Sequence, residues 1–202
     1  MKKLAIICAT VLLATVVFVF LPTISDAGIF DQTMRLHVVA NSDSEFDQDL
    51  KLLVRDRITQ ELEEIFNGLS DIATAEDAVN HNMDTLLEAV HQVLAEAGVE
   101  YSATIEIDTA FFPTMVYEDV AFPAGRYRAV IVRLGEAVGE NWWCVLFPPL
   151  CLAAASAELP SNSERLTEAG FTPDQVRIVT QSEDSPRFVV RFRLLELFGG
   201  RS

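Results

Sequence analysis

The sequence has few basic residues for its length. Its 202 residues include 15 Lys and Arg against 30 Asp and Glu, which gives a formal net charge of -15. Proteins that grip the phosphate backbone of nucleic acids need stripes of Lys and Arg, and domains that bind anionic lipid need basic patches. The charge balance therefore excludes a general nucleic-acid binder and argues against peripheral binding to anionic membranes.

Catalytic motifs are missing as well. The sequence contains no HExxH, GxSxG, P-loop or paired CxxC motif, and no Asp-Thr-Gly or Asp-Ser-Gly triplet of an aspartic protease. Of the three histidines, His81 and His91 lie ten residues apart on one predicted helix, where a metal-binding pair needs a spacing of four. His37 falls in the first predicted strand. We therefore assign no catalytic residue, no metal ligand and no cofactor.

Cysteine is scarce, with three residues in the whole chain. Cys8 lies in an N-terminal apolar segment, so the rest of the chain has only Cys144 and Cys151. In an oxidising compartment such a pair can close a small loop through a disulfide. The alternatives are two buried thiols that pack as small apolar groups and a nucleophilic cysteine, although no histidine lies near in sequence to act as its base.

The chain begins with an apolar segment. Two lysines precede 18 uncharged residues, Leu4–Leu21, and the small residues of Ser25-Asp26-Ala27 follow. A basic pair before such a run is typical of an export signal, but as a helix the run extends about 27 Å, enough to remain in a bilayer. We predict that residues 1–27 are a signal peptide or a membrane anchor, and that residues 28–202 form one domain outside the cytoplasm.

Hydrophobic periodicity predicts both strands and helices in that domain. Predicted strands cover residues 34–40, 101–109, 127–134, 142–147, 176–180 and 188–197. The third and fourth are expected to form a hairpin, and the last two are expected to pair. Residues 112–125, between the second and third predicted strands, are predicted to form an aromatic loop. Predicted helices begin at Ser44, Thr74 and Ser161 and end near Gly68, Gly98 and Gly170. This order predicts one α+β domain with helices layered on a largely antiparallel sheet.

Acidic and amide side chains occupy alternate positions before the first predicted helix: Asn41, Asp43, Glu45, Asp47 and Asp49. Calcium loops place oxygen ligands with similar alternation, but Phe46 stands where an EF-hand needs glycine and Leu52 stands where it needs glutamate. The other interpretation is a helix N-terminus whose acidic residues cap the helix and favour its dipole. Leu50, Leu53 and Val54 begin an apolar repeat at helical spacing in this helix.

Two adjacent tryptophans, Trp142 and Trp143, precede Pro148-Pro149. Neighbouring residues of a strand point to opposite faces, so at most one of these rings lies in the core beneath the sheet. The other needs a loop, a helix or a partner protein to cover it, and tryptophan often anchors protein interfaces. A core strand closed by a diproline turn and a protein interface both remain open.

Three blocks of sequence carry a resemblance to a known family. They are Arg35–Ser44 with its continuation to Asp56, the block Phe122–Tyr127, and the run from Gly135 through Trp-Trp-Cys to Cys151. On these blocks the chain resembles the stage II sporulation protein R family of endospore-forming bacteria, over about residues 34–198.

The resemblance implies signalling rather than catalysis. Such a protein is made in the forespore and exported into the space between the two septal membranes. There it activates a membrane-embedded aspartic protease of the mother cell, which then processes pro-sigma-E. The expected partner is this sigma-E factor-processing peptidase, and the N-terminal export signal fits that role.

For contacts with the partner we select Asn41, Ser42, Asp43, Trp142, Trp143, Pro148 and Pro149. Arg55 and Asp56 are predicted to form an internal ion pair that orders the first helix. Two other functions stay open: an envelope hydrolase with an unrecognised acidic site that includes Asp43, and a calcium-stabilised structural module.

Overall fold

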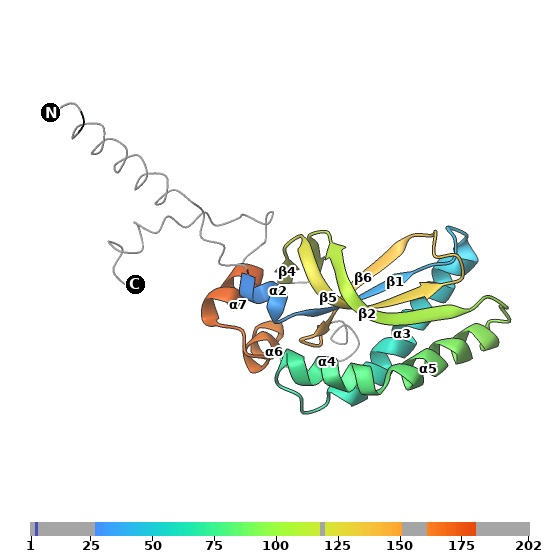
Figure 1. The fold of residues 1–202 in the computed structure, drawn as a ribbon, viewed down its shortest axis with the longest axis horizontal. Helices are drawn as coiled ribbons and strands as arrows, with labels where there is room; N and C mark the ends of the chain where they lie inside the picture. Colours follow the sequence, from blue (N-terminus) through green and yellow to red (C-terminus); the bar gives the residue numbers. More distant parts are fainter. Residues whose placement is uncertain (1–2, 4–26, 118–119, 151–160, 181–202) are drawn as a thin grey trace. The chain divides into compact units, whose positions relative to one another are not determined.

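The computed structural model describes residues 3, 27–117, 120–150 and 161–180 (Figure 1). Apart from residue 3, all of these belong to one compact unit, Asp26–Pro186. Most of the predicted leader, as well as Cys151 and the predicted strand at 188–197, lie outside the described residues. Within the described part of the chain, no helix is both long enough and apolar enough to cross a membrane.

A four-stranded mixed sheet forms the centre of the compact unit. Its order is β2 (Ala103–Phe112), β5 (Gly125–Leu134), β1 (Met34–Val39) and β6 (Asn141–Phe147). The β1–β5 pair is parallel, and the other two pairs are antiparallel. The predicted α+β class is therefore confirmed, with a sheet that is mixed.

The predicted hairpin of β5 with β6 is wrong, because β1 lies between these two strands. Leu36 and Val38 of β1 are fully buried on one face, and Arg35 is fully buried on the other. A strand buried on both faces belongs in the interior of a sheet, where it has a neighbour along each edge. The link between β5 and β6 crosses the end of β1, where the Gly139 amide donates to the Ala40 carbonyl oxygen at 3.0 Å.

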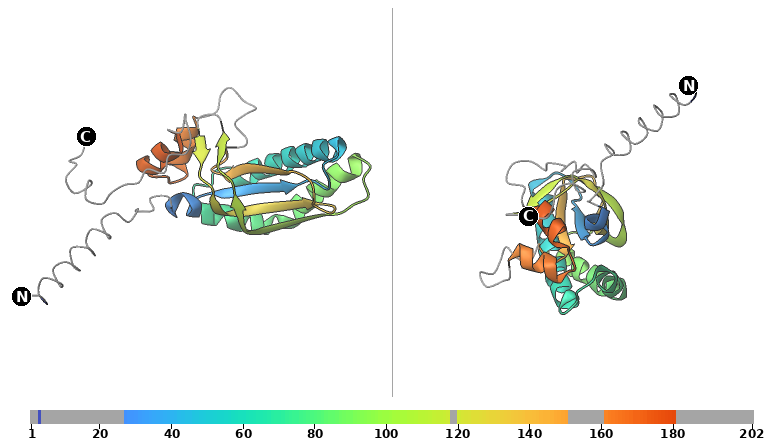
Figure 2. Two further views of the ribbon diagram at one scale, coloured as in Figure 1. Left: turned by 90° about the horizontal axis from the view of Figure 1, so that it is seen from above. Right: turned by 90° about the vertical axis from the view of Figure 1, so that its left-hand side faces the viewer.

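Three helices, α3 (Glu45–Phe66), α4 (Ile72–His81) and α5 (Met83–Glu96), cover one face of the sheet (Figures 1 and 2). As predicted, Ser44 caps the first of them, since its hydroxyl oxygen accepts the Asp47 amide at 3.1 Å.

The second predicted helix is two helices, because the chain breaks at Asn82. The Asn82 backbone has φ -106° and ψ 13°, and its side-chain amide donates to the Ala78 carbonyl oxygen at 2.8 Å. Asparagine side chains compete in this way for backbone hydrogen bonds and so favour helix ends. Helix α4 also begins before Thr74, because the carboxylate of Asp71 accepts the Thr74 amide at 2.9 Å and caps the helix.

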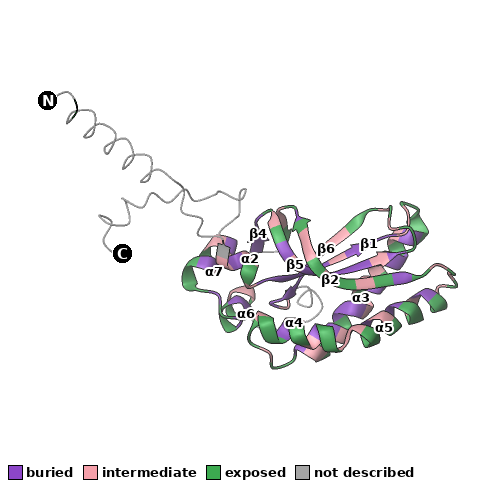
Figure 3. Ribbon diagram, viewed as in Figure 1, coloured by how far each residue is buried: buried purple, intermediate pink, exposed green. Residues whose placement is uncertain are grey.

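The hydrophobic core lies between these helices and the sheet (Figure 3). The sheet contributes alternate residues of β1 and β5, and the helices contribute residues at helical spacing; the fully buried members include Leu36, Val38, Val130, Val132, Val54, Ile58, Leu86 and Val90. Burying a side chain of this kind stabilises a fold by about 1.5–3 kcal/mol. The apolar residues that repeat at strand spacing and those that repeat at helical spacing therefore pack together in one core.

A short hairpin, β3 (Met115–Tyr117) and β4 (Val120–Phe122), lies on the opposite face of the sheet (Figure 1). The sequence predicted a loop here, and strands of three residues leave too short a pattern to detect. The hairpin brings the rings of Tyr117 and Phe122 to within 5.8 and 5.6 Å of the buried Arg35 guanidinium carbon.

Three shorter helices complete the described chain: α2 (Ala27–Asp31), α6 (Asn162–Glu168) and α7 (Pro173–Thr180). The capping box at Ser161 begins α6, as predicted. Helix α7 occupies residues predicted as a strand at 176–180. It begins with a second capping box, in which the Thr172 amide donates to Gln175 Oε1 at 2.7 Å and the Gln175 amide donates to Thr172 Oγ1 at 3.3 Å. Proline at the first helical position strengthens this signal, which should have outweighed the β-branched residues that follow.

Candidate functional site

The turn after β1 holds three of the predicted contact residues, and it is braced against the link between β5 and β6. Asn41 Oδ1 accepts the Glu136 amide at 2.9 Å, and Asp43 Oδ1 accepts the Glu140 amide at 2.8 Å. The two segments touch so closely that a Cβ atom at Gly139 would lie 2.2 Å from the Ser42 carbonyl oxygen. These side chains therefore hold two loops together, and their contact with a partner stays a prediction.

Asp47 lies beneath this turn and is buried, with 6% of its surface exposed. Its Oδ2 accepts hydrogen bonds from Asn41 Nδ2 at 2.9 Å and Ser42 Oγ at 2.5 Å, and its Oδ1 accepts one from the Tyr101 hydroxyl at 2.8 Å. Burial alone would raise the pKa of Asp47, but the hydrogen bonds from Ser42, Asn41 and Tyr101 lower it below its usual value. Asp47 is therefore an ionised structural group, and N–H and O–H donors occupy its oxygens.

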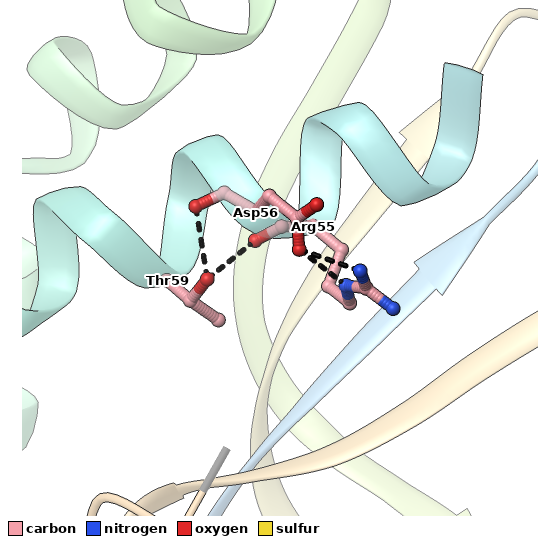
Figure 4. A network of polar contacts seen from close by, with 3 residues as sticks. All are labelled: Arg55, Asp56 and Thr59. Carbon is pink, nitrogen blue, oxygen red and sulfur yellow. Dashed lines mark hydrogen bonds and ion pairs between the residues drawn. The ribbon is translucent and has the colours of Figure 1, made fainter. Parts of the chain in front are cut away.

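Trp142 points toward the helices, on the face opposite Trp143, as the alternation of a strand predicts. The guanidinium carbon of Arg55 lies 4.4 Å from the centre of its ring. Arg55 also pairs with the Asp56 carboxylate at 2.6 Å, and the Thr59 hydroxyl donates to the carbonyl oxygens of both residues at 2.9 Å (Figure 4). The predicted Arg55–Asp56 pair is present, and it holds the guanidinium beside Trp142.

Trp143 lies on the other face, where it stacks on His37 with ring centres 3.9 Å apart and planes 19° apart. The edge of Phe112 approaches the same indole at 4.7 Å. His37 Nε2 lies 2.7 Å from Asn141 Oδ1. Burial lowers the pKa of His37, the bond to Asn141 opposes this effect, and the charge of Arg133 adds to it. Each tryptophan is thus half-buried against side chains of its own chain.

Arg35 is a further feature of this face, and the sequence reading overlooked it. It is fully buried, its Nε donates to the Cys144 carbonyl oxygen at 3.1 Å, and its Nη2 donates to the Tyr117 hydroxyl at 2.7 Å. The Tyr117 hydroxyl in turn donates to the Trp143 carbonyl oxygen at 3.1 Å. Burial lowers the pKa of Arg35, against the opposing effects of Tyr117 and Tyr127. An arginine within a mostly apolar strand was the signal that could have identified it.

The remaining predicted residues lie at the far end of β6. Seven residues of strand separate this end from the first turn, a distance of about 20 Å. Pro148 is buried and Pro149 is half-buried, and the Pro149 carbonyl oxygen accepts Arg165 Nη1 at 2.9 Å. Cys144 is disulfide-bonded, and Cys151, its predicted partner, lies outside the described residues. The predicted contact residues therefore form two groups at opposite ends of one edge strand.

In the described ranges, no group of three or more His, Cys, Asp or Glu side chains is placed to hold a metal ion.

The sequence was compared with known proteins. Residues 30–157 match the model of a family described as stage II sporulation protein R. A curated relative, stage II sporulation protein R of Bacillus subtilis strain 168, is 36% identical over 121 residues, which amount to 60% of this chain and 54% of the relative. The chain thus matches about half the length of that relative. No solved structure matches it.

Proposed function

The chain belongs to the stage II sporulation protein R family, and on this premise we propose that it is an exported signalling protein of sporulation. It is made in the forespore and crosses into the space between the two septal membranes. There it activates the membrane-embedded aspartic protease of the mother cell, the sigma-E factor-processing peptidase, so that pro-sigma-E is cleaved. The N-terminal segment directs export and, where it is retained, anchors the chain to the membrane.

The family match carries this proposal. Residues 30–157 include all four strands of the central sheet, the hairpin β3–β4, and the helices α3 to α5. They also include the turn after β1, the link between β5 and β6 that contacts it, and every residue selected as a partner contact. The proposed activity therefore belongs to the part of the chain in which the relationship to the family is observed.

Activation by such a protein requires a difference in affinity between two states of the protease. A ligand that binds the active and inactive states equally shifts no equilibrium, whatever its affinity. A change from 1% to 99% active protease requires about 10⁴-fold tighter binding to the active state. A preformed binding surface strengthens binding because little ordering entropy is lost, and the hydrogen-bonded turn around Asn41 provides such a surface. The preference for the active state then comes from contacts that only that state of the protease offers.

The chemistry of the acidic turn supports binding rather than hydrolysis. A general acid that works near neutral pH needs a raised pKa, whereas hydrogen bonds from Ser42, Asn41 and Tyr101 lower the pKa of Asp47. Asp43 is exposed, and its Oδ1 already accepts the backbone amide of Glu140. Both carboxylates are therefore arranged as acceptors that hold the turn, which favours the signalling proposal over an envelope hydrolase.

Reconstitution in a non-sporulating bacterial host tests the proposal. The protease and pro-sigma-E are expressed with and without the exported chain, and cleavage of pro-sigma-E is read by immunoblot. We expect cleavage only when the chain is present and exported. A form that lacks residues 1–27 serves as the matched control, because it is made in the same host but stays in the cytoplasm.

The predicted contacts are tested in the same assay with Trp142→Ala and Trp143→Ala. Loss of cleavage in a variant that is exported and folded supports an interface role. If neither substitution lowers cleavage, the tryptophans serve the fold alone. If pro-sigma-E is cleaved equally with and without the unaltered chain, the signalling proposal fails.

A further inference from the structure

The outer face of α3 carries two large apolar side chains that the fold leaves exposed. Phe46 is 54% exposed and Leu53 is 56% exposed. They are seven residues apart on the helix, so they point in directions about 20° apart and lie about 10.5 Å apart along its axis. Leu53 belongs to the apolar repeat of this helix, yet the fold leaves it exposed. Single exposed apolar residues are common, but these two lie in line on one face of the helix, and we call them the apolar strip.

Acidic side chains border this strip. Asp49 and Asp56 lie to one side of Phe46 and Leu53, about 40–80° around the helix from them, and both are exposed. The nearest arginines are already engaged, since Arg55 pairs with Asp56 at 2.6 Å and Arg57 pairs with Glu61 at 2.7 Å. We call the set of Phe46, Asp49, Leu53 and Asp56 the outer face of α3. Its centre is apolar and its border is negatively charged.

A surface cavity lies on the flank of the same helix. It has a volume of about 350 Å³, and its lining comes from α3 and α5: Arg57, Glu61, Asp84, Thr85, Glu88, Ala89 and Gln92. Three carboxylates line it against one guanidinium, which pairs with one of those carboxylates. Arg57 lies one turn beyond Leu53, so the cavity continues the outer face with a second acidic border.

We propose that the outer face of α3 docks a segment of the partner protein that combines apolar side chains with lysine or arginine. An apolar strip with a charged border matches the general anatomy of protein interfaces. The acidic border selects a basic partner, since like charges placed opposite one another disfavour binding. This inference rests on the proposed function, because it assigns the segment to the extracytoplasmic side of the activated protease.

The same charges disfavour two other occupants. A second copy of this chain would bring one acidic border against another, and the chain as a whole has a net charge of -15. An anionic lipid surface repels the same carboxylates and requires basic residues that this face lacks in unpaired form. A protein segment with both basic and apolar side chains can contact the apolar strip and pair with the acidic border.

The experiment compares two matched pairs of substitutions in the full chain. The test pair is Phe46→Gln with Leu53→Gln. The control pair is Phe111→Gln with Val116→Gln, which alters two side chains of β2 and β3 that are 61% and 60% exposed. All four positions are exposed, so both pairs are expected to retain the melting temperature of the unaltered chain. Binding to the protease in detergent and cleavage of pro-sigma-E in the reconstituted host are measured together.

We expect the test pair to weaken binding at least about tenfold and to lower cleavage, while the control pair changes neither by more than about twofold. Asp49→Lys should weaken binding chiefly through a slower association rate and reduce its dependence on salt.

Equal binding by the test pair and the unaltered chain overturns the inference and leaves the proposed function standing. If the unaltered chain neither binds the protease nor causes cleavage, the proposed function falls and the inference falls with it. A dimer of the unaltered chain that the test pair abolishes in sedimentation also overturns it, because the face then joins two copies of this chain.

Discussion

Arg35 and Asp47 are charged side chains buried near the two ends of β1, and the chain surrounds them differently. Asp47 accepts three hydrogen bonds from the side chains of Asn41, Ser42 and Tyr101. Arg35 donates to the Cys144 carbonyl oxygen and to the Tyr117 hydroxyl, and among the residues that the structure describes its Nη1 is buried without a hydrogen-bond partner. Four aromatic rings enclose its guanidinium, namely those of Phe112, Tyr117, Phe122 and Tyr127. In the described part of the chain, neither charge joins an ion pair.

The difference shows two ways to keep a charge inside a protein. At Asp47, three hydrogen-bond donors compensate for the loss of water around the carboxylate, and the resulting network fixes the geometry of a turn. At Arg35 the rings supply volume and cation–π attraction, and the guanidinium supports the hairpin β3–β4 through Tyr117. The stability of the fold should therefore depend mainly on the volume of the side chain at position 35 and mainly on hydrogen bonding at position 47.

The largest effect is expected at Arg35. Arg35→Ala leaves a cavity among the four rings and should lower the free energy of unfolding by about 3–5 kcal/mol. Arg35→Met refills most of that volume, and replacement of a buried charge by an apolar group of similar size is often close to neutral. We expect a loss of about 1 kcal/mol from removal of the hydrogen bond between Arg35 Nε and the Cys144 carbonyl oxygen. Urea unfolding followed by circular dichroism measures both.

Arg128 provides the matched control. It is 40% exposed and pairs with Glu76 on the helical face of the sheet, so Arg128→Met should change stability by less than about 1 kcal/mol. Equal losses in Arg35→Ala and Arg35→Met would show that charge and hydrogen bonds matter more than volume at this position, which would remove the contrast with Asp47.

The effect at Asp47 should be smaller and should depend on polarity. Asp47→Ala leaves the donors of Asn41, Ser42 and Tyr101 without their acceptor, which should lower stability by about 2–3 kcal/mol. Asp49→Ala alters an exposed carboxylate of the same helical turn and should stay within about 0.5 kcal/mol of the unaltered chain. Thermal unfolding compares the two. A similar small loss in both would mean that the turn does not depend on the network.

The same carboxylate sets a pH dependence whose sign follows from its lowered pKa. The unfolded chain takes up a proton at Asp47 near pH 4, before the folded chain does. The stability that this carboxylate provides is therefore present above about pH 4 and is lost as the pH falls through the lowered pKa. Asp47→Asn should start from lower stability at neutral pH and lose less of it in acid.

Much of the fold follows from sequence patterns that act locally. The apolar run of β1, the cap at Ser44 and the alternation in β2 each predicted the element observed. The opposite orientation of Trp142 and Trp143 followed from strand geometry alone. These features depend on neighbours within a few residues, so a single sequence contains the information.

The errors arose where the structure depends on contacts between residues that are far apart in the sequence. The Gly135–Gly139 link looked like a hairpin turn because the sequence does not show that β1 inserts between β5 and β6. The Tyr101–Asp47 bond joins residues 54 positions apart, and the rings around Arg35 come from β2, β3, β4 and β5. Leu53 fitted the apolar repeat of α3, yet the sheet covers only one side of that helix.

His37 lies on β1 two residues after Arg35, and its titration should give the smallest of these effects. Burial lowers its pKa from the ordinary value of 6.5, helped by the charge of Arg133, although Glu106 pairs with Arg133. The unfolded chain therefore binds the proton first as the pH falls through about 6.5, and the stability linked to neutral His37 declines below that pH. Melting temperatures from pH 8 to pH 5 should fall less steeply for His37→Gln than for the unaltered chain. An unchanged slope in His37→Gln would show that the imidazole stacked on Trp143 accepts its proton as readily as in the unfolded chain. Of the two basic side chains on this face of β1, only Arg35 would then have its pKa lowered by burial.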